Sequence, residues 1–123
     1  MKYGIEQLLG KTLSEIHNAN TEILFVDNNG DRYRMWHSQD CCESVSIDDI
    51  VGDLNDLIGS EITMAKESVS TDNPKDEYAE SFTWTFYKLA TAKGYVDIRW
   101  YGSSNGYYSE SVSFNKIDSD DEL

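Results

Sequence analysis

The hydrophobic positions of this chain follow two different periods. Runs with the alternation, or with the β-branched and aromatic content, of strands cover residues 12–17, 21–26, 32–37, 41–47 and 61–68. The turn formers of the sequence DNNGD separate two of these runs and predict a hairpin. The start of the chain predicts a short helical turn over residues 5–9 that ends at Gly10. These segments together favour antiparallel sheet.

One segment follows the helical period instead. Its apolar residues recur at intervals of three and four: Ile47, Ile50, Val51, Leu54, Leu57 and Ile58. Ser46 with Asp49 resembles a capping box, and Gly59 supplies a stop. The opposite side carries four carboxylates, which are Asp48, Asp49, Asp53 and Asp56. This pattern predicts an amphipathic helix that packs on a sheet.

The stretch 81–114 predicts three antiparallel strands in succession. Large aromatic residues alternate with other residues along it, so that one aromatic face is buried and the other meets water. The rings expected to be buried beneath the helix are those of Phe82, Trp84, Phe86 and Trp100. Tyr101 should project from the opposite face, near Arg99.

The predicted fold class is therefore α+β. It consists of a twisted antiparallel sheet, a meander of hairpins, with one main amphipathic helix packed on one face. We expect a single domain over residues 1–117 and an acidic, disordered tail over residues 118–123. The polar segment 71–80, which contains the only proline, is expected to be a mobile surface loop.

The charge of the chain narrows the classes of partner. In 123 residues, 10 Lys and Arg against 23 Asp and Glu give a net charge of −13. Because the cations are scattered, we expect no direct binding to nucleic acid or to membranes. The chain has neither a membrane-length apolar run nor a signal-peptide core near its start, which predicts a cytoplasmic protein. The acidity either keeps the protein soluble or imitates a phosphate backbone.

The two cysteines, Cys41 and Cys42, are adjacent. Neighbouring residues of an extended chain point to opposite faces, so we expect reduced thiols, one of them buried as a small apolar group. With His37 and Glu43 they suggest zinc, but adjacent strand cysteines cannot both turn inward. A cysteine nucleophile would lack a third, orienting group. We therefore predict no metal site, no cofactor and no catalytic residue, and hence a protein that is not an enzyme.

The segment 102–108 carries more hydrogen-bonding groups than a turn requires. With the preceding strand it combines aromatic planes, a guanidinium, hydroxyls and an amide, which suit a small polar planar ligand or a protein interface. In this hypothesis Tyr101 and Tyr107 stack on the ligand and Arg99 contacts an anion, while the other side chains form hydrogen bonds. The candidate ligand-binding residues are Arg99, Tyr101, Ser104, Asn105, Tyr107, Glu110 and Glu43.

Two segments, DCCESVSIDDIVGDLNDLIG and TWTFYKLATAKGYVDIRWYGSSNGYYSESVSF, resemble a family of small uncharacterised bacteriophage and prophage proteins. The likeness spans roughly residues 37–114. The residues that match the family pattern are Asp40, Cys41, Cys42, Glu43, Gly52, Asp53, Trp100, Tyr101, Gly102, Ser104, Asn105, Gly106, Tyr107, Tyr108, Ser109 and Glu110. The resemblance implies phage origin and no particular mechanism.

Phage origin favours a non-enzymatic binding protein of host-modulating or counter-defence type, acting in the host cytoplasm. It would bind a small polar, nucleotide-like ligand or a host protein through residues 99–110, and a second subunit could complete the pocket in a homo-oligomer. An alternative is an acidic nucleic-acid mimic that blocks a basic host protein through the helix carboxylates and the tail. A second alternative is a metal-dependent enzyme that requires His37 or Cys42.

Overall fold

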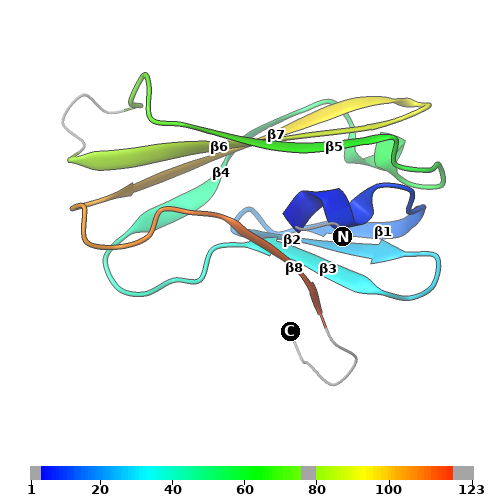
Figure 1. Ribbon diagram of the computed structural model, residues 1–123, viewed down its shortest axis with the longest axis horizontal. Coiled ribbons are helices and arrows are strands. Elements are labelled where there is room, and N and C mark those ends of the chain that lie inside the picture. Colours follow the sequence, from blue (N-terminus) through cyan, green and yellow to red (C-terminus); the bar gives the residue numbers. More distant parts are fainter. Residues whose placement is uncertain (1–3, 76–79, 118–123) are drawn as a thin grey trace.

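The protein is a sandwich of two four-stranded antiparallel sheets (Figure 1). The computed structural model describes residues 4–75 and 80–117. The first sheet has the strand order β1-β2-β3-β8 and the second the order β4-β7-β6-β5. The strands are β1 (Leu13–Asn18), β2 (Glu22–Asp27), β3 (Arg32–Trp36), β4 (Ser44–Val51), β5 (Met64–Ser70), β6 (Ser81–Thr91), β7 (Gly94–Ser104) and β8 (Ser113–Ile117). Two short 3₁₀ helices, η1 (Gly4–Leu8) and η2 (Leu54–Leu57), complete the described elements.

The predicted amphipathic helix is wrong, and with it the α+β fold class. The described residues contain no helix longer than the five residues of η1. In the helix-period segment, residues 47–51 belong to strand β4 and Leu54–Leu57 form the short 3₁₀ helix η2. A β-bulge shifts the register between Ile47 and Asp49. The extra residue places two inward-facing apolar side chains, Ile47 and Ile50, three positions apart, which is a helical spacing. The bulge therefore gives the apolar residues of this strand the sequence spacing of a helix.

The last strand also departs from the predicted meander. β6 and β7 form a hairpin as expected, but β8 pairs with β3 in the other sheet. Residues 105–112 therefore cross from the second sheet to the first, as Figure 1 shows in orange. They form a connection between the layers and not a hairpin turn.

The core lies between the two sheets and is rich in aromatic and branched residues. Trp100 on β7 is fully buried, as predicted, and its indole Nε1 donates to Met35 Sδ on β3 over 3.3 Å. The other large, fully buried side chains include Phe25, Ile23, Leu13, Tyr87, Leu89 and Ile98. Helix η1 contributes Ile5 and Leu8 between the sheets at one end.

The face of β6 that turns inward is the opposite of the one predicted. Thr85 and Tyr87 are buried, whereas Phe82, Trp84 and Phe86 are only half-buried and lie on the outer face of the second sheet. Both faces of this strand carry large rings, so alternation alone does not reveal which one meets the core. The outer face consequently keeps a row of aromatic side chains.

Other local predictions are confirmed. The hairpin of β2 and β3, the first strand and the helical turn before Gly10 all form, and buried Asp27 accepts hydrogen bonds from the N–H groups of Asn29 and Asp31 in the hairpin turn. The predicted tail at 118–123 and part of the 71–80 loop lie outside the described residues. Within the described part of the chain, no helix is long and apolar enough to cross a membrane.

Candidate functional site

The seven predicted ligand-binding residues do not form one site. Arg99 and Tyr101 lie on the outer face of the second sheet. Glu43, Ser104 and Glu110 belong to polar clusters on the side of that sheet that faces the first. Asn105 and Tyr107 lie in the exposed connection after β7, where Asn105 Oδ1 accepts from the Tyr107 N–H at 3.0 Å and the tyrosine side chain is open to solvent.

Cross-strand pairing arranges the outer face in rungs that run across all four strands. One rung consists of Ser70, Trp84, Tyr101 and Ser46. The next consists of Ser68, Phe86, Arg99 and Asp49. A third consists of Lys66, Lys88, Asp97 and Val51. Residues within a rung are neighbours in space although the sequence scatters them over positions 46–101.

The aromatic rings of the outer face contact one another. The centroids of Trp84 and Tyr101 are 4.5 Å apart with tilted planes, and those of Trp84 and Phe86 are 6.3 Å apart and nearly parallel. The indole of Trp84 donates to the carbonyl of Asn73 at 2.9 Å, and Lys75 Nζ lies 5.9 Å from the Tyr101 ring. The segment after β5 thus packs on the Trp84 and Tyr101 end of the row.

A groove of 530 Å³ lies at the other end of the row. It spans the Phe86 rung and the Lys88 rung, and it is open along one side. Its lining is mainly apolar with charged groups on both flanks. This size falls within the range of about 300–1,000 Å³ that is common for small-molecule sites.

Ion pairs fix the charged groups on the β4 side of the groove. The Arg99 guanidinium contacts Asp48 Oδ2 at 2.8 Å and Asp49 Oδ2 at 3.7 Å. The hydrogen bonds from Lys75 and from Arg99 together hold the pKa of Asp48 below its ordinary value, although its burial acts in the opposite direction. Arg99 is therefore not a free cation, and Asp48 is not a free anion. Asp53 is also engaged, since its carboxylate caps η2.

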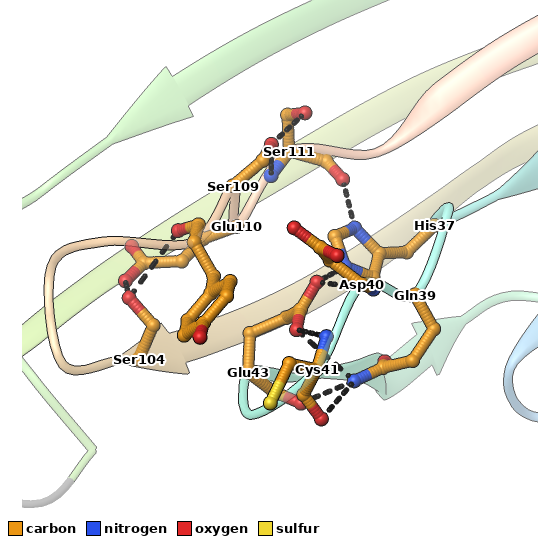
Figure 2. Close-up of polar contacts among 10 residues, drawn as sticks. His37, Gln39, Asp40, Cys41, Glu43, Ser104, Ser109, Glu110 and Ser111 are labelled. Carbon is orange, nitrogen blue, oxygen red and sulfur yellow. Dashed lines mark hydrogen bonds and ion pairs between the residues drawn. The ribbon is translucent and has the colours of Figure 1, made fainter.

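Glu43 is the centre of a polar cluster beside the inner face (Figure 2). Its fully buried carboxylate accepts from the Asp40 N–H, the Cys41 N–H and the amide of Gln39 at 2.9–3.1 Å. Burial raises the pKa of Glu43, but the hydrogen bonds, from the Asp40 N–H and then from His37, outweigh it and lower the pKa to about 2. The oxygens of this carboxylate are thus occupied by its own loop.

His37 joins that loop to the chain crossing between the sheets. Its Nε2 lies 2.8 Å from Glu43 Oε2, and its Nδ1 lies 2.6 Å from the carbonyl oxygen of Ser111. An ionised carboxylate and a carbonyl only accept hydrogen bonds, so each ring nitrogen of His37 faces an acceptor. These two contacts connect the Glu43 loop to the segment that carries Ser111.

Glu110 forms the second polar cluster, in the segment 105–112 that connects the two sheets. Its carboxylate accepts from the hydroxyl of Ser104 at 2.6 Å (Figure 2). It also accepts from the hydroxyl of Thr83 at 2.8 Å. Ser104 in turn accepts from the Gly106 N–H. Gly102 packs against this cluster, because a Cβ at that position would lie 2.8 Å from the Glu110 carbonyl. Ser104 and Glu110 therefore hold the crossing in place.

The cysteine prediction is wrong in both of its parts. Cys41 and Cys42 are joined by a disulfide bond, and both residues are exposed. Alternation placed one sulfur inward, but residues 41–42 lie in a bend before β4 and not in a strand. Within residues 4–75 and 80–117, no group of three or more His, Cys, Asp or Glu side chains is arranged to hold a metal ion.

Sequence reasoning missed the residues that line the groove, above all Phe86, Lys66 and Lys88. Phe86 was assigned to the core, and the two lysines had no evident neighbour in the sequence. Pairing β5 with β6 in the correct register would have revealed them, because that register places Lys66 opposite Lys88 and next to Phe86. Arg99, which lines the groove, and Tyr101, which lies outside its lining, were both placed on the outer face because alternation puts them on one face of a single strand.

Comparison with known proteins identifies a family without an assigned activity. A family model described as a domain of unknown function (DUF7448) matches residues 6–114. No curated protein and no solved structure matches the chain.

Proposed function

Because this chain belongs to a domain family of unknown function, we propose its function from its own surface. It is a binding protein that holds a small planar polar molecule in the groove on the outer face of the second sheet. The observation that carries this proposal is the half-buried ring of Phe86, which lines the groove and contacts the ring of Trp84 on the same strand. A nucleobase-containing metabolite belongs to this class of molecule.

The ring of Phe86 has no role in the core of the sandwich. The core is supplied by the inner face, where Tyr87 and Trp100 are already fully buried. A half-buried ring on the outer face of a sheet offers apolar surface to a partner. Stacking on a planar ring is the interaction that such a position offers.

The groove favours a small molecule over a protein as the partner. Its volume of 530 Å³ suits a ligand of nucleoside size. The flanks provide hydrogen-bonding groups, and the ion pair with Asp48 orients the guanidinium of Arg99. A rigid polar flank beside an aromatic ring fixes the orientation of a planar ligand.

We propose binding without turnover. The buried carboxylates of Glu43 and Glu110 accept hydrogen bonds from their own surroundings, which leaves them without a catalytic task at the groove. Sequestration of a host metabolite, one of the roles that phage origin would favour, requires only a site of this kind. The imitation of nucleic acid is less favoured, since Asp48 and Asp53 have partners within the fold.

Titration with adenosine, guanosine, cytidine and uridine tests the proposal, with Trp84 fluorescence and calorimetry as readouts. Base stacking on an aromatic side chain contributes about 1–3 kcal/mol, so Phe86→Ala should weaken binding about tenfold or more. Phe82→Ala is the matched control, because Phe82 lies on the same outer face outside the groove lining. Its affinity should stay within about twofold of the wild type. Absence of binding by all four nucleosides, or equal binding by Phe86→Ala, would refute the proposal.

A further inference from the structure

Two lysines lie opposite each other next to the Phe86 rung. Lys66 on β5 and Lys88 on β6 are direct cross-strand partners, and both are exposed. Like charges at directly opposite positions of an antiparallel pair destabilise it. Within the described residues, neither ammonium group forms a hydrogen bond or an ion pair. In a chain with 23 acidic residues and only 10 basic ones, such an unpaired couple requires an explanation.

Around Lys66 and Lys88, the other charged groups of the groove do not cancel both positive charges. Asp97 shares the rung with Lys88 but lies beyond ion-pair distance, and it offsets one positive charge of the two. Glu67 is paired with Tyr87, whose side chain faces the core, so Glu67 points away from the lysine face. Arg99 is balanced by its two aspartate contacts. The six charged lining side chains, three cations and three carboxylates, sum to zero, and the two cations without an ion pair, Lys66 and Lys88, lie on the β5 and β6 side.

The spacing between ring and charge is set by the strand. Phe86 and Lys88 are two residues apart on one face of β6, which corresponds to about 7 Å along the strand. A pentose separates a nucleobase from its 5′-phosphate by a similar span. A base stacked on Phe86 would thus place a phosphate on the lysine rung.

We infer that the ligand is a nucleoside monophosphate, whose phosphate lies between Lys66 and Lys88 while its base stacks on Phe86. This inference rests on the proposed function, because it uses the same groove. A single phosphate, with one to two negative charges, is closer to the charge of the two ammonium groups and Asp97, which sum to +1, than a chain of several phosphates would be. Further phosphates would find no other unpaired cation in the groove lining and would approach Asp97 or Asp49.

Affinities of the four nucleosides and of their 5′-monophosphates test the inference. In the wild type we expect each bound monophosphate to bind at least about tenfold more tightly than its nucleoside, since charge-assisted hydrogen bonds contribute about 1.5–3 kcal/mol. The double variant Lys66→Gln/Lys88→Gln should lose this advantage and keep the affinity for nucleosides. Lys116→Gln is the control for charge, because Lys116 pairs with Asp31 in the first sheet.

The outcomes separate this inference from the proposed function. If nucleosides bind as tightly as their monophosphates, the inference about the phosphate is wrong, but the proposed binding of a planar molecule in the groove still stands. A phosphate advantage that survives in the double lysine variant would also overturn it, since the anion would then lie elsewhere. Loss of the advantage in the double variant, but not in Lys116→Gln, would support it. Binding of no compound would refute both.

Discussion

Replacement of Gly102 by alanine tests the packing that fixes the chain crossing between the sheets. A Cβ at this position would lie 2.8 Å from the Glu110 carbonyl oxygen, 3.0 Å from Glu110 Cβ and 3.0 Å from Val45 Cγ2. Two of these three atoms belong to the backbone or to its first side-chain atom, so they cannot rotate away. The Glu110 carbonyl has to retreat from 2.8 Å to beyond 3.4 Å, where ordinary contact begins.

The energetic cost has two parts. Overpacking of a closely packed site costs about 1–3 kcal/mol. The displacement also strains the hydrogen bonds from Thr83 and Ser104 to the Glu110 carboxylate, and a bond to a charged group contributes about 1.5–3 kcal/mol. We therefore expect Gly102→Ala to lower the free energy of unfolding by about 3 kcal/mol.

Urea denaturation followed by tryptophan fluorescence measures this effect. With a slope of about 1.5–2 kcal/mol per molar, the midpoint should fall by about 1.5–2 M with an unchanged slope. Ser103→Ala is the control, because Ser103 neighbours Gly102 on β7 and its side chain lies on the opposite face. A Gly102→Ala midpoint equal to that of Ser103→Ala would refute the packing argument.

Two further predictions follow from the core and from the Glu43 cluster. Trp100→Ala should destabilise the protein by about 3–5 kcal/mol in the same urea assay, because it leaves a cavity between the sheets and removes the contact with Met35. A loss below about 1 kcal/mol would contradict the placement of Trp100 in the core. The pKa of Glu43 is lowered from 4.5 to about 2, so its contribution to stability is complete above pH 4.5 and is lost as the pH falls to 2. Urea midpoints measured over this range should decline less for Glu43→Gln than for the wild type, and equal declines would show that the carboxylate is not stabilised by folding.

Local sequence signals predicted the elements that depend on local interactions. The hairpin around Asp27 and the hairpin of β6 and β7 each join strands that are adjacent in the chain, and their turn residues fix the pairing. The alternation along β7 correctly separated buried Trp100 from outward Tyr101. In these segments, both the alternation of the side chains and the partner strand are contained in one short stretch of the sequence.

The errors share a physical cause, which is that the deciding interaction lies far away in the chain. The bulge in β4 is defined only against β7, and without it Ile47 and Ile50 have the spacing of a helix. Strand β8 finds its partner β3 about eighty residues earlier, as in the pair Phe114 and Met35. Phe86 points outward because the first sheet covers the other face of β6. The sequences of β6 and β7 alone do not determine which face is covered.

The two faces of the second sheet differ in what their polar and aromatic residues do: those of the inner face form hydrogen bonds within the fold, and those of the outer face line the groove. The residues that looked most like a binding site, Glu43, Ser104 and Glu110, satisfy hydrogen bonds that hold the loops near β8. Such buried networks are costly when incomplete, which explains why hydrogen-bonding groups accumulate around a chain crossing without any ligand. The groove around Phe86 has the opposite character, because its two lysines form no hydrogen bond or ion pair among the described residues and the Phe86 ring, which contacts Trp84, lies outside the core. Groups that the fold leaves unpaired are the ones available to a ligand, and this contrast is the reason why we propose the binding function for the outer face.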